Sequence, residues 1–409
     1  MSRIVFLFCL VIFVAPARCA EIFATPLSVD QLIAEAMENN PDILIMNSRL
    51  QALEGALAEG SAYANPTLEY KRGTDENHSG EIRLAQPLSL NGRIPLSRKL
   101  ARAETAAYLK TIAVKKLDIA AAVKKNYYAA RFAQERIKFE QEHYNSAANI
   151  LSKIEARQRI DEARAADVSM ARAEVSLSKF HMQAARSRAD ILNAELNVLL
   201  GRQPDSPLTL EEADLGIPEA EENASLEDYA ARALRNSGEL NELAFRAEAN
   251  DAQLNLEKRK RIPDLTAGIA QVQEDTLNYT QFSLELEIPL WYRNGGAIKS
   301  ALARGQALER ERRRLELTIN NEVRKAWLEK ALAASLVRTL EKNLLTITDL
   351  RKNFSQDYLA GKIDLSVYYQ INERFVKEHI EYIDAMQDYW NRTADFDRVL
   401  SAALYRENK

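Results

Sequence analysis

The chain has few cysteines and, beyond its first residues, no long apolar run. Its 409 residues contain 2 Cys, Cys9 and Cys19, which is too few for a disulfide framework or a cysteine metal site. No stretch of about 18 consecutive apolar residues follows residue 20, which excludes a membrane protein built from many spanning helices. The formal net charge is -4 and no long basic block occurs, which argues against general nucleic-acid binding.

The sequence also lacks the patterns of an enzyme. It has no nucleophile–base arrangement and no phosphate-binding loop, so we expect no catalytic site and no cofactor. Its 4 histidines have no ligand spacing, so no metal site is predicted. Each is expected on a solvated helix or loop: His78, His143, His181 and His379.

Residues 1–20 have the features of a secretory signal peptide. Arg3 supplies a positive charge, an apolar run extends from Ile4 to Val14, and Ala15-Pro16-Ala17 offers small residues for cleavage. Cys19 is a candidate for lipid attachment, but Arg18 stands where a lipoprotein signal has a small residue. We therefore expect export, with lipidation left open.

Two pairs of amphipathic strands organise the chain. In the strand expected at about 279–290, apolar and polar residues alternate, which is typical of a strand with one oily face and one wet face. The first pair, at about 66–73 and 80–90, has the same alternation around Ile82 and Arg83. The expected lipid face is Phe282, Leu284, Leu286 and Ile288, and the expected water face is Gln281, Ser283, Glu285 and Glu287.

Very long helices follow each strand pair. The helix expected at about 93–156 contains no Gly and, after Pro95, no Pro, and its apolar residues recur at intervals of three, four or seven residues. Its apolar stripe is Ile112, Ile119, Val123, Tyr127 and Ala130. The later helix carries leucines that we expect to be core: Leu328, Leu332, Leu336, Leu340 and Leu344.

The second half of the chain repeats the order of the first. A short helix, a medium helix, two strands and a long helical hairpin recur at a nearly constant offset, which indicates a duplication. Their lengths suggest that two shorter helices stack end to end beside each long one. The expected divisions are 1–20 (signal), 21–207 (first repeat, with long helices at about 93–156 and 167–200), 208–224 (linker) and 225–409 (second repeat, with strands at about 263–273 and 279–290 and long helices at about 295–355 and 365–405).

Four amphipathic strands are too few to close a membrane barrel, because closed barrels need about eight. An open sheet in lipid would leave unpaired edges, which hydrocarbon does not tolerate. Pooling the strands of three chains gives about 12 and removes the edges. The fold class expected is therefore mainly α with a small β part, assembled as a trimer that spans a membrane with 12 strands and projects its long helices on one side.

The chain resembles the TolC-like outer-membrane efflux proteins, in particular the shorter kind found in cation and heavy-metal efflux systems. The residues that carry the resemblance are the strand–helix junctions and the turn 358–365, and the resemblance covers essentially the whole mature chain. The junction residues are Pro87, Gly92, Pro289, Gly295 and Gly296. The resemblance implies a homotrimeric duct, in which a 12-stranded barrel in outer-membrane lipid is joined to an α-helical barrel. The same resemblance implies a large periplasmic portion and an equatorial band. It also implies two partners, a periplasmic adaptor and an inner-membrane transporter, with the resistance-nodulation-division (RND) type expected for the latter.

One feature departs from the family pattern. Many relatives have a ring of aspartates just after the turn glycine, whereas this chain has Ser366 and Tyr369 at the acid positions. Asp357 and Asp364 lie nearby and are candidates to replace that ring, or they are ordinary turn and cap residues. A third arrangement is closure by packing around Tyr368 and Tyr369.

Two classes of function remain after the sequence is considered. One is a passive transport duct, for metal cations or small toxic compounds, or for protein in a type I secretion system. The other is an exported coiled-coil structural or adhesion protein. The strand pairs favour the duct, because a coiled-coil spacer has no use for amphipathic strands bracketed by Pro and Gly. The cargo is not determined by the sequence.

Overall fold

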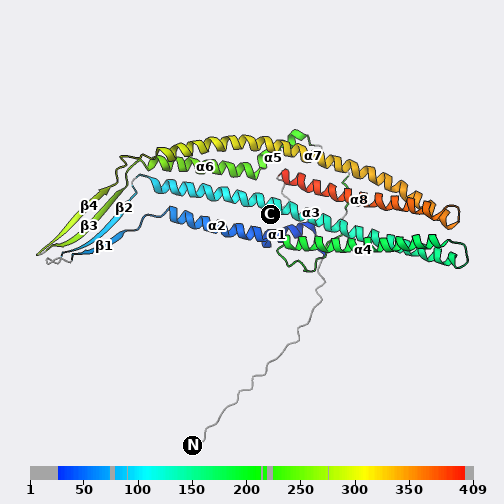
Figure 1. The fold of residues 1–409 in the computed structure, drawn as a ribbon. Coiled ribbons are helices and arrows are strands. Elements are labelled where there is room, and N and C mark those ends of the chain that lie inside the picture. The colour runs from blue at the N-terminus through cyan, green and yellow to red at the C-terminus, as the bar shows by residue number, and fades with distance from the viewer. Residues whose placement is uncertain are drawn as a thin grey trace, which may run out of the picture.

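A computed structural model gives the fold of this chain and describes residues 26–73, 79–89, 91–212, 215–218, 224–274 and 276–400. The molecule is elongated, with a four-stranded sheet at one end and two helix turns at the other (Figure 1). The expected signal peptide, Cys19 and His78 lie outside the described residues. The same is true of the end of the last helix predicted, beyond residue 400.

The order of the helices and strands repeats in the two halves of the chain, as the predicted duplication requires. In each half a short helix and a medium helix precede the strands, and a long helical hairpin follows them. The first half contains α1 (Val29–Asn39), α2 (Pro41–Gly60), α3 (Arg93–Gln158) and α4 (Ala165–Leu199). The second half contains α5 (Leu226–Asn236), α6 (Gly238–Arg259), α7 (Gly295–Leu359) and α8 (Leu365–Val399).

Local sequence explains where the short and medium helices begin. Ser28 caps α1 in a capping box with Gln31, and Ser225 caps α5 in the same way with Asp228. Pro41 takes the first position of α2, where its missing N–H costs nothing. These starts were predicted, and the structure confirms them.

The predicted end-to-end stacking is also present. α3 has 66 residues and is about 99 Å long, and α2 and α4 follow one another along it. α6 and α8 follow one another along α7 (Figure 1). α3 packs against both of these helix pairs, whereas α7 packs against α5, α6 and α8. The long helices thus form a layer in which α2 with α4 lies at one flank and α7 lies at the other.

Gly201 fixes the joint between α4 and the start of α2. Its φ is +75°, a left-handed conformation that ends α4, and a Cβ placed there would lie 2.3 Å from the carbonyl oxygen of Asn39. Asn40, which separates α1 from α2, donates from its side chain to the carbonyl of Leu199 at 2.8 Å. The two stacked helices are therefore joined by close backbone contact.

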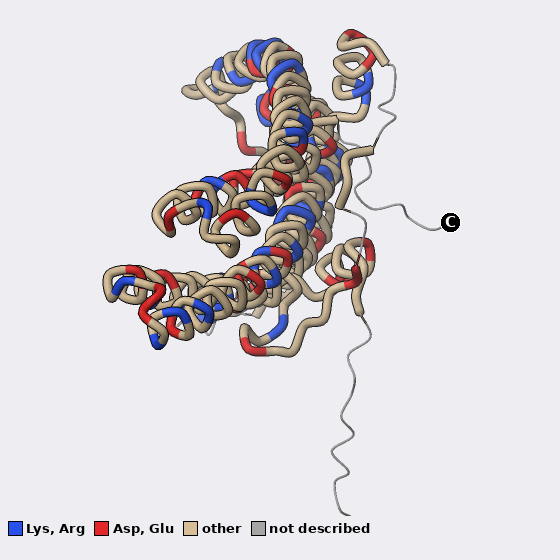
Figure 2. Tube along the Cα trace, turned by 90° about the vertical axis from the view of Figure 1, so that its right-hand side faces the viewer, with Lys and Arg blue, Asp and Glu red and all other residues tan. Residues whose placement is uncertain are grey.

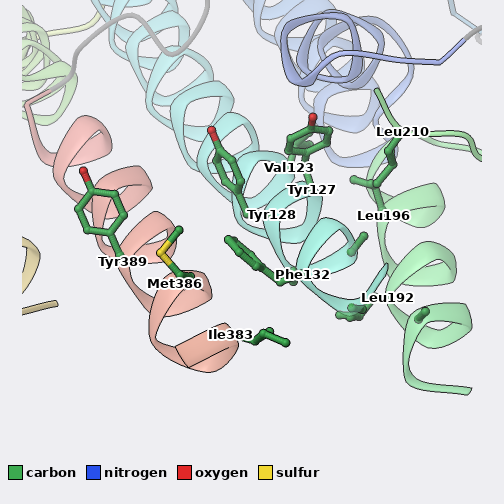
Figure 3. Close-up of a cluster of buried hydrophobic side chains, with 14 of the residues drawn as sticks. Val123, Tyr127, Tyr128, Phe132, Leu192, Leu196, Leu210, Ile383, Met386 and Tyr389 are labelled. Carbon is green, nitrogen blue, oxygen red and sulfur yellow. The ribbon is translucent and has the colours of Figure 1, made fainter. Parts of the chain in front are cut away.

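The main core lies at the middle of the rods, where α1, α3, α4, α7 and α8 meet. Figure 3 shows Val123, Tyr127 and Phe132 of α3 between Leu192 and Leu196 of α4 and Ile383 and Met386 of α8. The stripe predicted for α3, from Ile112 to Ala130, is buried throughout. Burying large side chains stabilises the fold by about 1.5–3 kcal/mol each, so this region anchors both hairpins.

Two expectations about burial were wrong. Leu328, Leu332 and Leu336 are exposed, because they lie on a flank of α7 that none of the described residues covers. Only Leu340 and Leu344 of that stripe pack against the core. His143, expected in solvent, is buried between α3, α4 and α8, where its ring contacts Asn372 at 3.1 Å and Glu174 at 3.4 Å. His379, also expected in solvent, is half-buried, and its ring stacks on that of Phe139 at 3.9 Å.

The strands form one antiparallel sheet in the order β1 (Thr67–Arg72), β2 (Gly80–Leu88), β3 (Leu265–Glu274) and β4 (Leu277–Leu286). The central pair β2–β3 joins the two repeats, and β1 and β4 are the edges. β4 ends four residues earlier than predicted, because Leu286 pairs with the first residue of β3. Glu287 and Ile288 therefore follow the strand and do not belong to it.

Candidate functional site: the amphipathic sheet and the paired helix turns

One face of the sheet is apolar and exposed. The register places Leu68, Leu84, Ile269 and Phe282 in one row across the four strands. Phe282 is 79 % exposed and Leu284 is 76 % exposed. The face continues through Leu286, and past the strand Ile288 is also exposed. Soluble monomers rarely expose contiguous apolar patches of this kind, which mark contacts with a membrane or another protein.

The opposite face is polar and less exposed. It carries Glu81 and Arg83 of β2 and Ser283 and Glu285 of β4, as the alternation predicts. Its middle is lined by small residues, because Ala85 of β2 and Ala270 of β3 are buried there and Gly268 of β3 pairs with Ala85. Small residues inside and large residues outside are what a sheet needs in order to curve toward its polar face.

An arginine crosses this polar face. The guanidinium of Arg83 reaches from β2 over β3 to β4, where it donates to the Ser283 hydroxyl at 3.2 Å and lies 3.6 Å from the Glu285 carboxylate. A Cβ at Gly268 would lie 3.4 Å from Nε of Arg83 and 2.6 Å from the Ser283 hydroxyl. The glycine therefore provides the space through which Arg83 passes.

The predicted junction residues lie where strands become helices. Pro87 belongs to β2 itself, and Gly92 precedes α3 with a φ of +70°. Gly295 and Gly296 begin α7 after Asn294, which has a φ of +56°. Pro289 lies in the segment between β4 and α7, next to Leu290 and Trp291, which are both exposed. Apolar and aromatic residues thus extend the exposed face to the start of the helices.

At the opposite end of the molecule the two helical hairpins share a small apolar core. It contains Ile154 of α3, Val168 of α4, and Tyr358 and Tyr368 of α7 and α8. The rings of Tyr358 and Tyr368 stack at 5.5 Å, and Tyr369 lies beside them. Burial raises the pKa of all three tyrosines, so they are neutral at physiological pH.

The candidate aspartates at this end have cationic partners. Asp357 contacts Lys362 at 3.1 Å within the α7–α8 turn, and Asp364 lies 3.8 Å from Arg164 of the α3–α4 turn. Asp364 precedes α8 as its N-cap, without a side-chain cap bond, and Ser366 lies in the first turn. The structure therefore brings the two turns together through an ion pair and a tyrosine cluster.

The buried polar contacts of His143 were not predicted from the sequence. Its partners Glu174 and Asn372 come from other helices, so no local pattern marks it. Among the described residues, no three His, Cys, Asp or Glu side chains are placed to hold a metal ion. Within the same residues, no helix has the length and apolarity needed to cross a membrane.

Comparison of the fold with solved structures gives close matches. The open state of the Neisseria gonorrhoeae MtrE outer membrane channel matches with a TM-score of 0.78 at 15 % identity, over 93 % of this chain and 90 % of that one. The outer-membrane channel OprN matches at 0.77 with 15 % identity, over 92 % and 90 %. CusC, described in terms of transmembrane channel formation, matches at 0.77 with 15 % identity, over 91 % of each chain.

This chain has the outer-membrane channel fold. The likeness extends over nearly the full length of these proteins, so the four-stranded sheet and the long helical hairpins belong to one shared architecture. At the level of sequence, neither a protein-family model nor a curated protein matches the chain. The same fold is thus formed here by a sequence that is 15 % identical to each of these three channels.

Proposed function

We propose that this chain is the outer-membrane duct of a tripartite efflux system and acts as a homotrimer. Three sheets would join edge to edge into a 12-stranded barrel, and the helices would extend into the periplasm. The observation that carries the proposal is the exposed apolar face of the sheet, from Leu68 through Phe282. Its edge strands β1 and β4 need partners in lipid, where unpaired backbone groups cost several kcal/mol.

The helices support the same assembly. The flank formed by α4 exposes Met170, Leu177, Phe180 and Ile191, and the flank formed by α7 exposes Leu317, Leu328 and Leu332. Two different apolar flanks on opposite sides of one layer suit a head-to-tail contact, which closes into a ring when the rotation between copies is right. Elsewhere on the rods, basic and acidic residues are interspersed, as on solvated helices (Figure 2).

The partners and cargo of this duct are proposed from the sequence resemblance. A periplasmic adaptor would meet the ends of the hairpins, and an inner-membrane transporter, of RND type, would supply the cargo. Metal cations or small toxic compounds are the cargo we favour. A duct for type I protein secretion is the alternative within the same fold, and an exported adhesion protein is the alternative outside it. The duct itself needs no catalytic site.

The assembly is tested by measuring the mass of the detergent-extracted protein. We expect three chains per particle and ion conductance after reconstitution into planar bilayers, because only a closed ring removes the sheet edges. A folded, monodisperse monomer without conductance would contradict the proposal.

We further propose that the periplasmic end is closed by packing around Tyr368 and Tyr369. Asp357 and Asp364 already contact Lys362 and Arg164 in ion pairs that are exposed to solvent and therefore weak. The double variant Asp357→Asn, Asp364→Asn should therefore change block of single-channel current by periplasmic divalent cations less than about twofold. Tyr368→Ala, which empties the shared tyrosine cluster, should raise the conductance.

The opposite result would favour an aspartate ring. If the double Asn variant loses cation block while Tyr368→Ala keeps the normal conductance, the two acids line the mouth and the packing interpretation is wrong. Ser366→Ala serves as a control, because Ser366 neighbours the same turn without carrying charge.

A further inference from the structure

The charges on the polar face of the sheet are unevenly distributed. In the four strands as described, this face carries four carboxylates, those of Glu69, Glu81, Glu274 and Glu285, and two cations, Lys71 and Arg83. Lys71 lies on edge strand β1, where it contacts Glu69 at 3.1 Å and Glu81 at 4.0 Å. Arg83 lies on a central strand and is the cation that reaches the middle of the sheet.

The side chain of Arg83 is held in place by residues of β3 and β4. Its side chain is 27 % exposed, whereas that of its partner Glu285 is 72 % exposed. Ala270 and Gly268 give it a flat path across β3, and the Ser283 hydroxyl accepts a hydrogen bond from its far end. An arginine whose guanidinium is held by a hydroxyl and a carboxylate keeps its charge at one fixed place on the polar face of the sheet.

We infer that Arg83, held across Gly268 against Ser283 and Glu285, sets the ionic preference of the duct by neutralising Glu285 on the lumen wall. The inference rests on the proposed function, since the polar face becomes a lumen only in the closed barrel. With Arg83 in place, each chain contributes a moderate negative charge to the wall. Without Arg83, the three copies of Glu285 act as free carboxylates on the lumen wall. A wall that carries charges of one sign raises the local concentration of counter-ions.

The test is the reversal potential of single channels in planar bilayers under a KCl gradient. The measurement is made at low ionic strength, since the Debye length is about 30 Å at 0.01 M and wall charges act across the lumen. Arg83→Gln should raise the K⁺ over Cl⁻ permeability ratio at least about twofold. Glu285→Gln should lower the ratio.

Two double variants test whether the charges of Arg83 and Glu285 offset each other. Arg83→Gln with Glu285→Gln should return the ratio close to that of the unmodified channel, because the pair is removed together. The exchange Arg83→Glu with Glu285→Arg keeps both charges and their contact, so it should also behave like the unmodified channel. This exchange keeps the inference testable if Arg83→Gln alone assembles poorly.

The outcomes are distinct. If the unmodified protein forms no channel, the proposed function fails and the inference fails with it. If channels form and the ratio is unchanged in both Arg83→Gln and Glu285→Gln, the duct remains and the role of Arg83 is refuted. If Arg83→Gln changes the ratio but removing Glu285 as well does not restore it, Arg83 acts as a lone charge and the pairing is refuted.

Discussion

Leu284→Arg is expected to leave almost no inserted trimer in the outer membrane. Leu284 lies in the middle of the exposed apolar band, between Phe282 and Leu286, and is itself 76 % exposed. An arginine on the lipid face costs about 2–4 kcal/mol near the bilayer midplane. Three symmetric copies raise this to about 6–12 kcal/mol per trimer, which is comparable to the whole stability of many proteins.

The matched control is Glu285→Arg, the next residue along β4 on the opposite face. It introduces the same side chain into the polar face, where it loses one exposed pair with Arg83 and places two like charges side by side. In contact with water these two changes cost about 1 kcal/mol each, less than an arginine in lipid. The amount of folded trimer in outer-membrane fractions measures both variants. Equal assembly of the two would mean that the apolar face of β4 does not meet lipid.

Gly201→Ala is expected to lower stability by about 3 kcal/mol, since it combines left-handed backbone strain with a close contact. The new Cβ would lie 2.3 Å from the Asn39 carbonyl oxygen, at the joint where α4 meets the start of α2. Part of the stacked rod must then shift. Loss of helical circular dichroism on heating the detergent-solubilised protein measures the effect.

Gly92→Ala is the control, because Gly92 also has a left-handed φ, +70°, but its Cβ would have no neighbour within 4 Å. Gly92→Ala should lower the stability only through left-handed backbone strain, by about 1–2 kcal/mol. The difference in stability between the Gly201→Ala and Gly92→Ala variants measures the effect of the close contact with Asn39. Equal shifts in melting temperature would show that the joint between the stacked helices adapts freely.

Much of this fold could be predicted from the sequence because its signals are local. The alternation around Phe282 fixes a strand with two unlike faces, and Ser28, Pro41 and Ser225 mark helix starts through their own side chains. The end of β4 could not be predicted. The alternation continues through Ile288, but the partner strand begins at Leu265, so pairing stops at Leu286.

The missed features all depend on contacts between distant residues. A leucine repeat marks an apolar stripe on α7 but does not say whether its partner belongs to the same chain, so Leu328 and Leu332 were misplaced in the core. His143 is buried where α3, α4 and α8 pack together, and its partner Asn372 is 229 residues away in the sequence. The passage of Arg83 across Gly268 became visible only when the register of β2 against β3 was known.

The two unlike flanks of the helical layer have a consequence for errors of assembly. A head-to-tail contact does not limit itself to three copies: if the turn between neighbours departs from one third of a circle, the same surfaces propagate into an open filament. In the proposed trimer, the curvature of the sheet and the pairing of β1 with β4 of the next copy would fix the angle between neighbours and so favour one closed ring. Chains that are exported but do not insert into the membrane would lack this constraint on the angle. We therefore expect these chains to polymerise.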